Sequence, residues 1–92
     1  MKQTVAVLRD KKSYVALAAK EASNEDIIAL VGSDKFAAYD DGSRFLAYCQ
    51  NGVGLITKLL EDHIIVTYAG EIAEILPRHL FRSKYQNPSE AE

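Results

Sequence analysis

Residues 51–80 read NGVGLITKLLEDHIIVTYAGEIAEILPRHL, and this stretch decides the fold. Three short apolar runs are separated by an acidic pair at 61–62 and an Ala-Gly pair at 69–70, and two glycines open the first run. Apolar runs divided by turn-forming residues are typical of consecutive antiparallel strands, and glycine inside a strand is typical of a sheet that bends sharply. The stretch therefore predicts a meander of strands that curves into a barrel-like C-terminal half.

Length and composition limit the chain to one small globular domain. Its 92 residues have room for one hydrophobic core, and 48% apolar with 26% charged residues is ordinary for a globular protein. Cys49 is the single cysteine, which excludes an intramolecular disulfide and a cysteine-based metal site. The N-terminal apolar run is too short for a signal peptide, and no stretch has the length of a membrane span. We expect a cytoplasmic protein that does not contact a membrane.

The N-terminal third combines a strand, an ambiguous segment and a helix. Residues 4–8 are an apolar, β-rich run. Residues 13–22 fit two structures, because their alanine content favours a helix whereas their position after the first strand favours a hairpin. Ser23 followed three residues later by Asp26 resembles a capping box, and Gly32 is placed to end the helix that follows.

An Asp-Gly pair at 41–42 separates two aromatic segments and predicts a tight hairpin. Tyr39 could pair with Phe45 across it, or Phe36 with Tyr48. Because successive side chains of a strand point to opposite faces, we expect two of these four rings in the core and two outside. Exposed aromatic rings are the residues on which protein interfaces are commonly centred.

The C-terminal segment is expected to end the domain. Proline suits the first position of a helix, so Pro77 predicts a single helical turn over residues 78–81. The polar composition from residue 83 onward predicts a globular domain over residues 1–82 and a disordered tail over 83–92. The whole pattern predicts an α+β domain: a strongly bent antiparallel sheet of five or six strands, barrel-like in its C-terminal half, with one short helix near residues 23–32.

Between Gly52 and Leu80 the order of elements resembles the SH3-like or Tudor-like small barrel. A glycine pair, an apolar strand, an acidic turn, the strand IIVTY, an Ala-Gly turn and a further apolar strand follow one another. The resemblance implies a barrel that binds protein or nucleic acid. It does not imply recognition of proline-rich peptides or methyl-lysine, because the chain lacks tryptophan and Tyr68 stands alone in its strand.

No residue pattern predicts catalysis. His63 and His79 lie on different elements with no carboxylate at a motif spacing, and the acidic pairs at 40–41 and 61–62 fit turns. Cys49 ends an apolar strand, where a free cysteine commonly behaves as a small buried hydrophobe. We therefore expect a protein that is not an enzyme and needs no metal or cofactor.

Two binding functions remain. The first is a protein-binding module or small regulator that uses an aromatic hairpin face or a sheet edge, with a homodimer through that edge as one form. Its candidate residues are Phe36, Tyr39, Phe45, Tyr48 and Tyr68. The alternative is nucleic-acid association through basic residues near both ends, although the net charge of −2 disfavours it. Those candidates are Lys11, Lys12, Arg78, Arg82 and Lys84.

Overall fold

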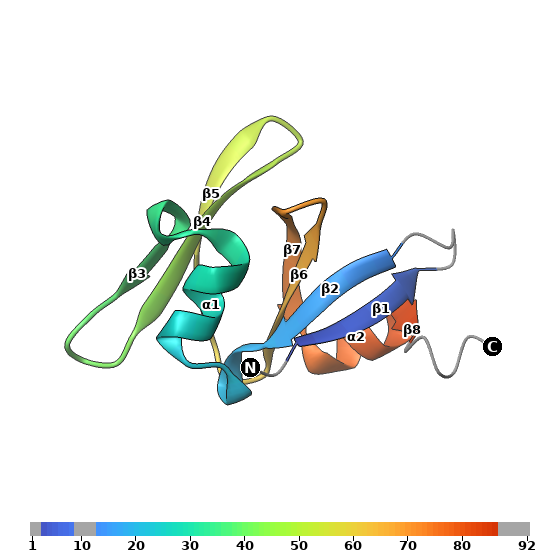
Figure 1. Ribbon diagram of the computed structural model, residues 1–92, viewed down its shortest axis with the longest axis horizontal. Helices are drawn as coiled ribbons and strands as arrows, with labels where there is room; N and C mark the ends of the chain where they lie inside the picture. Colours follow the sequence, from blue (N-terminus) through green and yellow to red (C-terminus); the bar gives the residue numbers. More distant parts are fainter. Residues whose placement is uncertain (1–2, 9–12, 87–92) are drawn as a thin grey trace.

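The chain folds as an α+β domain with two antiparallel sheets, seen in the computed structural model, which describes residues 3–8 and 13–86 (Figure 1). The larger sheet has five strands, in the spatial order β7 (Glu71–Pro77), β6 (His63–Tyr68), β2 (Ser13–Ala18), β1 (Gln3–Leu8) and β8 (Tyr85–Gln86). The smaller sheet has three strands, β3 (Phe36–Ala38), β4 (Arg44–Gln50) and β5 (Val53–Lys58). The helices are α1 (Asn24–Val31) and α2 (Arg78–Lys84), with 3₁₀ turns η1 (Ala19–Glu21) and η2 (Ser33–Lys35).

The strands of the described residues do not close into a barrel. The acidic pair at 61–62 was expected to turn one strand back onto the previous one, but β5 and β6 belong to different sheets. The Leu59 N–H donates to the Arg44 carbonyl at 2.8 Å, which keeps the chain beside β4 past the end of β5. Then β6 pairs with β2, far away in the sequence. The single bent sheet of five or six strands, its barrel-like C-terminal half and the SH3-like architecture are therefore not confirmed.

The ambiguous segment at 13–22 is mainly a strand. β2 pairs with β1 on one side and with β6 on the other, and η1 follows it directly. Leu17 and Ala16 are both buried, on opposite faces of the sheet. A central strand buried on both faces reads as a continuous apolar run, so alternation could not reveal it.

The helix predicted near 23–32 is confirmed. The Ser23 hydroxyl accepts a hydrogen bond from the Asp26 N–H at 3.1 Å, and the Asp26 carboxylate accepts one from the Ser23 N–H at 3.2 Å. This capping box satisfies two N–H groups that a helix start leaves unpaired. Ile27 and Val31 are buried on the inner side of α1, and the helix ends at Gly32.

Both faces of the five-stranded sheet are covered. On one face, α1 and the three-stranded sheet pack against it through a first cluster, which contains Leu17, Ala19, Ala22, Ile27, Val31, Leu46, Leu59, Ile65 and Ile72. On the opposite face, α2 packs against it (Figure 1), and the second cluster contains Ala16, Ile64, Val66, Leu76 and Tyr85. The smaller sheet lies at the outside of this arrangement, with one of its own faces turned away from the core.

The folded region continues past residue 82. α2 extends to Lys84, longer than the single predicted turn, and β8 then pairs with the end of β1. Tyr85 is 5% exposed, and its ring stacks on that of Phe81 with centroids 5.1 Å apart. Residues 83–86 are thus part of the domain rather than the start of a tail, because one aromatic ring anchors an otherwise polar segment. The remainder of the predicted tail lies outside the described residues.

Candidate functional site

The four aromatic residues of the hairpin are divided between the two faces of the three-stranded sheet. Phe36 and Tyr48 pack against the first cluster, and the Tyr48 hydroxyl lies 3.4 Å from that of Thr57. Tyr39 and Phe45 contact each other edge to face, with ring centroids 5.5 Å apart. The expected split of two rings inward and two outward is therefore observed, and the Tyr39–Phe45 pair is the one that forms.

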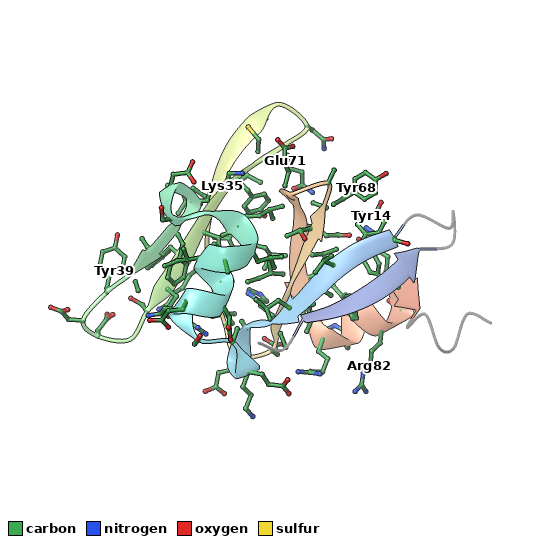
Figure 2. All side chains as sticks on the ribbon, viewed as in Figure 1. Tyr14, Lys35, Tyr39, Tyr68, Glu71 and Arg82 are labelled. Atoms are coloured by element: carbon green, nitrogen blue, oxygen red, sulfur yellow. The ribbon has the colours of Figure 1, made fainter. Side chains whose placement is uncertain are left out.

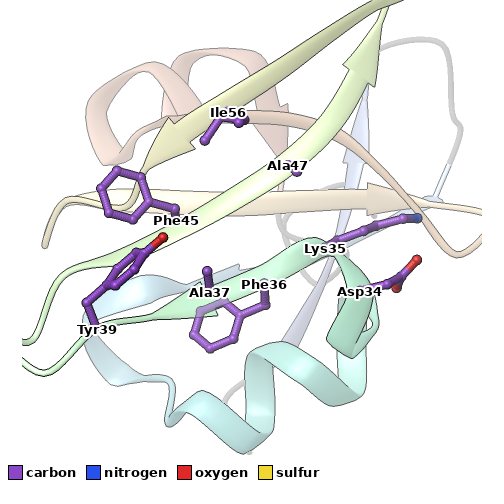
Figure 3. A pocket seen from close by; sticks show the side chains of 8 residues that line it. All are labelled: Asp34, Lys35, Phe36, Ala37, Tyr39, Phe45, Ala47 and Ile56. Atoms are coloured by element: carbon purple, nitrogen blue, oxygen red, sulfur yellow. The ribbon is translucent and has the colours of Figure 1, made fainter.

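The outward-facing rings belong to an exposed apolar surface, which we call the outer face: Ala37, Tyr39, Phe45, Ala47 and Ile56. Tyr39 is 59% exposed and Ile56 is 77% exposed, whereas Phe45 is half-buried. A depression of about 360 Å³ lies on this surface (Figure 3). The outer face, Phe36, Asp34 and Lys35 line it. Its only charged groups come from η2, at one end, so the depression offers apolar contact with very little polar recognition.

The tight turn between β3 and β4 positions the aromatic pair. The Asp41 carboxylate accepts hydrogen bonds from the Ser43 hydroxyl at 2.6 Å and from the Ser43 N–H at 2.9 Å. These two bonds hold the pKa of Asp41 below its usual range. The Tyr39 N–H donates to the Ser43 carbonyl at 2.9 Å, which closes the hairpin and sets its register. Phe45 therefore lies across from Ala37, next to the Tyr39 ring.

Sequence reasoning missed the contribution of β5. Asn51 and Gly52 both have left-handed φ angles, 54° and 79°, as a two-residue turn between antiparallel strands requires. This turn fixes the register between β4 and β5 and places Ile56 beside Ala47. If the residues of β4 and β5 are paired one by one starting from the Asn-Gly turn, Ile56 falls on the same face of the sheet as Phe45. The Asn-Gly pair was therefore the sequence signal that could have identified Ile56.

Tyr68 does not join the outer face. It lies at the end of β6 in the five-stranded sheet, and its ring contacts that of Tyr14 with centroids 5.0 Å apart. Tyr14 in turn contacts Tyr85. Tyr39 and Tyr68 lie on widely separated parts of the molecule (Figure 2). The five aromatic candidates thus occupy three locations: the outer face, the first cluster and the far end of the larger sheet.

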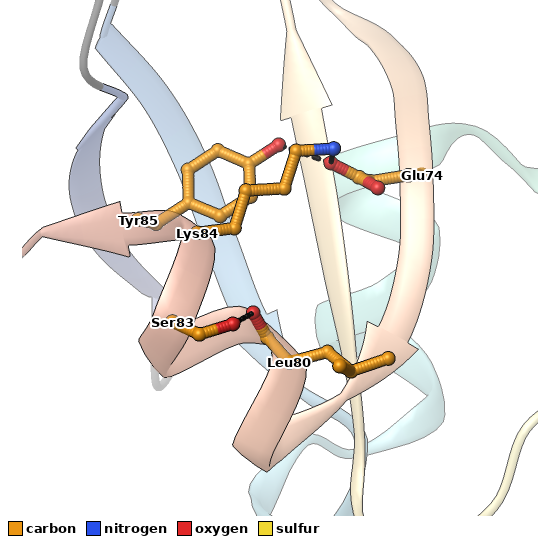
Figure 4. Close-up of polar contacts among 5 residues, drawn as sticks. All are labelled: Glu74, Leu80, Ser83, Lys84 and Tyr85. Atoms are coloured by element: carbon orange, nitrogen blue, oxygen red, sulfur yellow. Dashed lines mark hydrogen bonds and ion pairs between the residues drawn. The ribbon is translucent and has the colours of Figure 1, made fainter.

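The basic candidates that the structure describes are interspersed with acids. Lys84 forms an ion pair with Glu74 at 2.8 Å, and the same carboxylate accepts a hydrogen bond from the Tyr85 hydroxyl (Figure 4). Arg78 lines a depression together with Lys20 and three acidic residues, Glu21, Glu61 and Asp62. Arg82 is exposed on α2 and points away from the domain (Figure 2). Lys11 and Lys12 lie outside the described residues.

The candidates for acid–base, nucleophilic or metal chemistry are dispersed. The His63 ring nitrogen Nδ1 accepts a hydrogen bond from the Leu60 N–H at 3.2 Å and so closes the turn before β6. Cys49 is exposed rather than buried, because it shares the outward orientation of Ala47 on β4. Within residues 3–8 and 13–86, no group of three His, Cys, Asp or Glu side chains is placed to hold a metal ion. None of the helices in this part of the chain is long and apolar enough to cross a membrane.

Comparisons with protein-family models, with curated proteins and with solved structures find no match to this chain. The outer face combines exposed apolar side chains with a shallow depression. Such a surface can bury apolar area against a partner.

Proposed function

We propose that this protein is a binding module that recognises another protein through the outer face of its three-stranded sheet. The observation that carries the proposal is the contiguous placement of Tyr39, Phe45 and Ile56 around one depression. Contiguous exposed apolar surface on a small domain marks interaction sites, whereas single exposed apolar residues do not.

The outer face leaves apolar area exposed that a partner would bury. Burying one large apolar side chain contributes roughly 1.5–3 kcal/mol. Tyr39 and Ile56 are both largely exposed, so most of that contribution is still available to a partner. Tyrosine also keeps a hydroxyl for a hydrogen bond at the rim, and it is among the residues that dominate interface energies.

Nucleic-acid association through the basic residues has less support. Lys84 is already paired with Glu74, and Arg78 shares its depression with three carboxylates. Phosphate binding depends on uncompensated positive charge, and nearby carboxylates reduce it. Arg82 is the candidate in the described residues whose exposure suits that role.

The test is a tagged capture experiment from the native host lysate, with and without nuclease, comparing the natural chain with a variant of the outer face. Tyr39→Ser and Ala47→Glu together remove an aromatic anchor and place a charge in the depression, at two exposed positions. We expect one protein to be captured in stoichiometric amount by the natural chain, to survive nuclease and to be lost with the variant.

Two control variants separate this proposal from its alternative. Tyr68→Ser removes an exposed tyrosine of the other sheet and should leave capture unchanged. Arg78→Glu with Arg82→Glu should also leave it unchanged. Capture that persists in the outer-face variant refutes the proposed site, and material that disappears on nuclease treatment moves the assignment to the basic residues.

A further inference from the structure

β5 is an edge strand whose outward backbone groups lack a hydrogen-bond partner within the described residues. It is hydrogen-bonded on one side, to β4. Leu59 and Arg44 are opposite each other, and the Leu59 N–H donates to the Arg44 carbonyl, so they form a hydrogen-bonded pair. In an antiparallel ladder, hydrogen-bonded pairs alternate with pairs that do not exchange hydrogen bonds, so every second residue of β5 bonds to β4. Leu55 and Thr57 therefore bond to β4. The N–H and C=O groups of Gly54, Ile56 and Lys58 point outward, away from the sheet.

The other edges of the two sheets carry features that oppose further pairing. β3 has three residues and β8 has two. β7 contains a register shift against β6, and it ends in Pro77. Short strands, bulges, proline and charged side chains are devices by which proteins protect sheet edges. β5 is neither short, bulged nor interrupted by proline, and its one charged residue, Lys58, lies at its end. Ile56 at its centre is 77% exposed.

We infer that β5 pairs with β5 of a second copy of this chain, antiparallel, about a twofold axis through Ile56. In this register Ile56 lies opposite its own counterpart and Gly54 lies opposite Lys58, so each outward N–H and C=O of these three residues finds a partner. A register centred on Leu55 would instead set Lys58 against Gly52, which lies in the turn and is not extended. The product is one continuous six-stranded sheet with both outer faces on the same side.

The side chains of β5 fit the Ile56 register. A side chain at Gly54 would meet nothing within 4 Å, and this glycine has no left-handed φ, so the single chain does not require glycine there. In the pair, Gly54 leaves open the position across from Lys58 of the second copy. The two Lys58 residues are offset by four positions, about 13 Å along the strand, which limits their repulsion. The two Ile56 side chains meet at the centre and bury apolar surface.

Sedimentation of the full chain over low to high micromolar concentration tests this pairing. We expect a concentration-dependent species of twice the chain mass, and we expect Gly54→Pro to return it to the single-chain mass. The Gly54 N–H does not bond to β4, so proline removes an outward donor while leaving the hairpin intact. Gly54→Ala keeps the N–H and is the matched control that should still dimerise. A natural chain that stays monomeric, or a Gly54→Pro variant that still dimerises, overturns the inference.

Cross-linking tests the register independently of how Gly54→Pro folds. In a Cys49→Ser background, Ile56→Cys places two thiols across the axis at a Cα separation of about 5.5 Å, which suits a disulfide. We expect mild oxidation to produce a covalent dimer. Leu60→Cys is an exposed control beyond the end of β5 that should stay single. Faster cross-linking through Leu55→Cys, or none through Ile56→Cys, overturns the register.

The pairing goes beyond the proposed function and does not rest on it. Tyr39→Ser with Ala47→Glu should lose partner capture and keep the dimer. Gly54→Pro should lose the dimer and keep outer-face contact with the partner. Failure of the proposed partner binding can therefore be distinguished from failure of the proposed β5 dimer.

Discussion

Arg44 joins the two sheets, and replacing it should destabilise the domain markedly. Its guanidinium donates to the Ala22 carbonyl at 3.0 Å and to the Ala19 carbonyl at 2.8 Å, so the start of β4 is bonded to the end of the β2–η1 segment. A hydrogen bond to a charged group contributes roughly 1.5–3 kcal/mol. Because Arg44 is only half-buried, water will replace part of each bond, and we expect Arg44→Met to cost roughly 2–4 kcal/mol in total.

That cost is a large share of the stability available to a domain of this size, which is roughly 5–15 kcal/mol. It should lower Tm by at least about 8 °C. Methionine keeps the apolar stem, so the loss reports on the hydrogen bonds rather than on packing. Arg44→Lys should be intermediate, because a single ammonium cannot bond both carbonyls with the geometry of a guanidinium.

Urea denaturation of both variants measures the effect, with Arg82→Met as the control at an exposed arginine of α2. The control should stay within about 0.5 kcal/mol of the natural chain. An Arg44→Met variant whose unfolding midpoint matches that of the control, with an unchanged denaturant slope, would refute the reasoning. In that case the apolar contacts of the first cluster alone would hold the sheets together.

Three further predictions concern the core and the turns. Ile27→Ala removes a fully buried side chain that connects α1 to both sheets and should lower the free energy of unfolding by about 2–5 kcal/mol, measured in urea. Ala69 has a left-handed φ of 54° before Gly70, so Ala69→Asn should raise Tm by roughly 4–8 °C, corresponding to about 1 kcal/mol. The pKa of Asp41 is lower in the folded state than in the unfolded chain. The ionised carboxylate therefore stabilises the folded turn at pH values above the pKa that Asp41 has in the unfolded chain, and this stabilisation is lost as pH falls through the pKa that Asp41 has in the folded state. Ser43→Ala removes the largest cause, and an NMR titration of the Asp41 carboxyl should move toward the ordinary value; an unmoved midpoint contradicts the assignment.

Local signals predicted the parts of the fold that depend on neighbouring residues. The capping box of Ser23 and Asp26 defines α1, and the Asp-Gly pair defines the turn before β4. Each of these signals acts over a few residues through backbone hydrogen bonds or a left-handed φ. These local signals therefore predict the same helix start and turn whichever distant segments pack against them.

The pairings that depend on distant residues could not be predicted. Nothing near residues 61–62 indicates that the chain leaves one sheet there and enters the other, because the partner of β6 is β2. Tyr85 lies among polar neighbours in the sequence, and its burial depends on residues of β2, β6 and β7, which are contributed by earlier segments of the chain. For the outer face, alternation predicted that two rings point outward, but the Tyr39–Ser43 register decided which two.

The pairing of β8 with β1 constrains the order in which the fold can form. Leu8 lies opposite Tyr85, so the edge of the five-stranded sheet joins segments separated by most of the chain. The three-stranded sheet and the β6–β7 hairpin need only short loops, whereas β1–β8 contact must close a long one. During synthesis on the ribosome, α1 and the outer face can therefore form before β8 is available to pair with β1. The outer face is therefore expected to form before the edge of the larger sheet is covered.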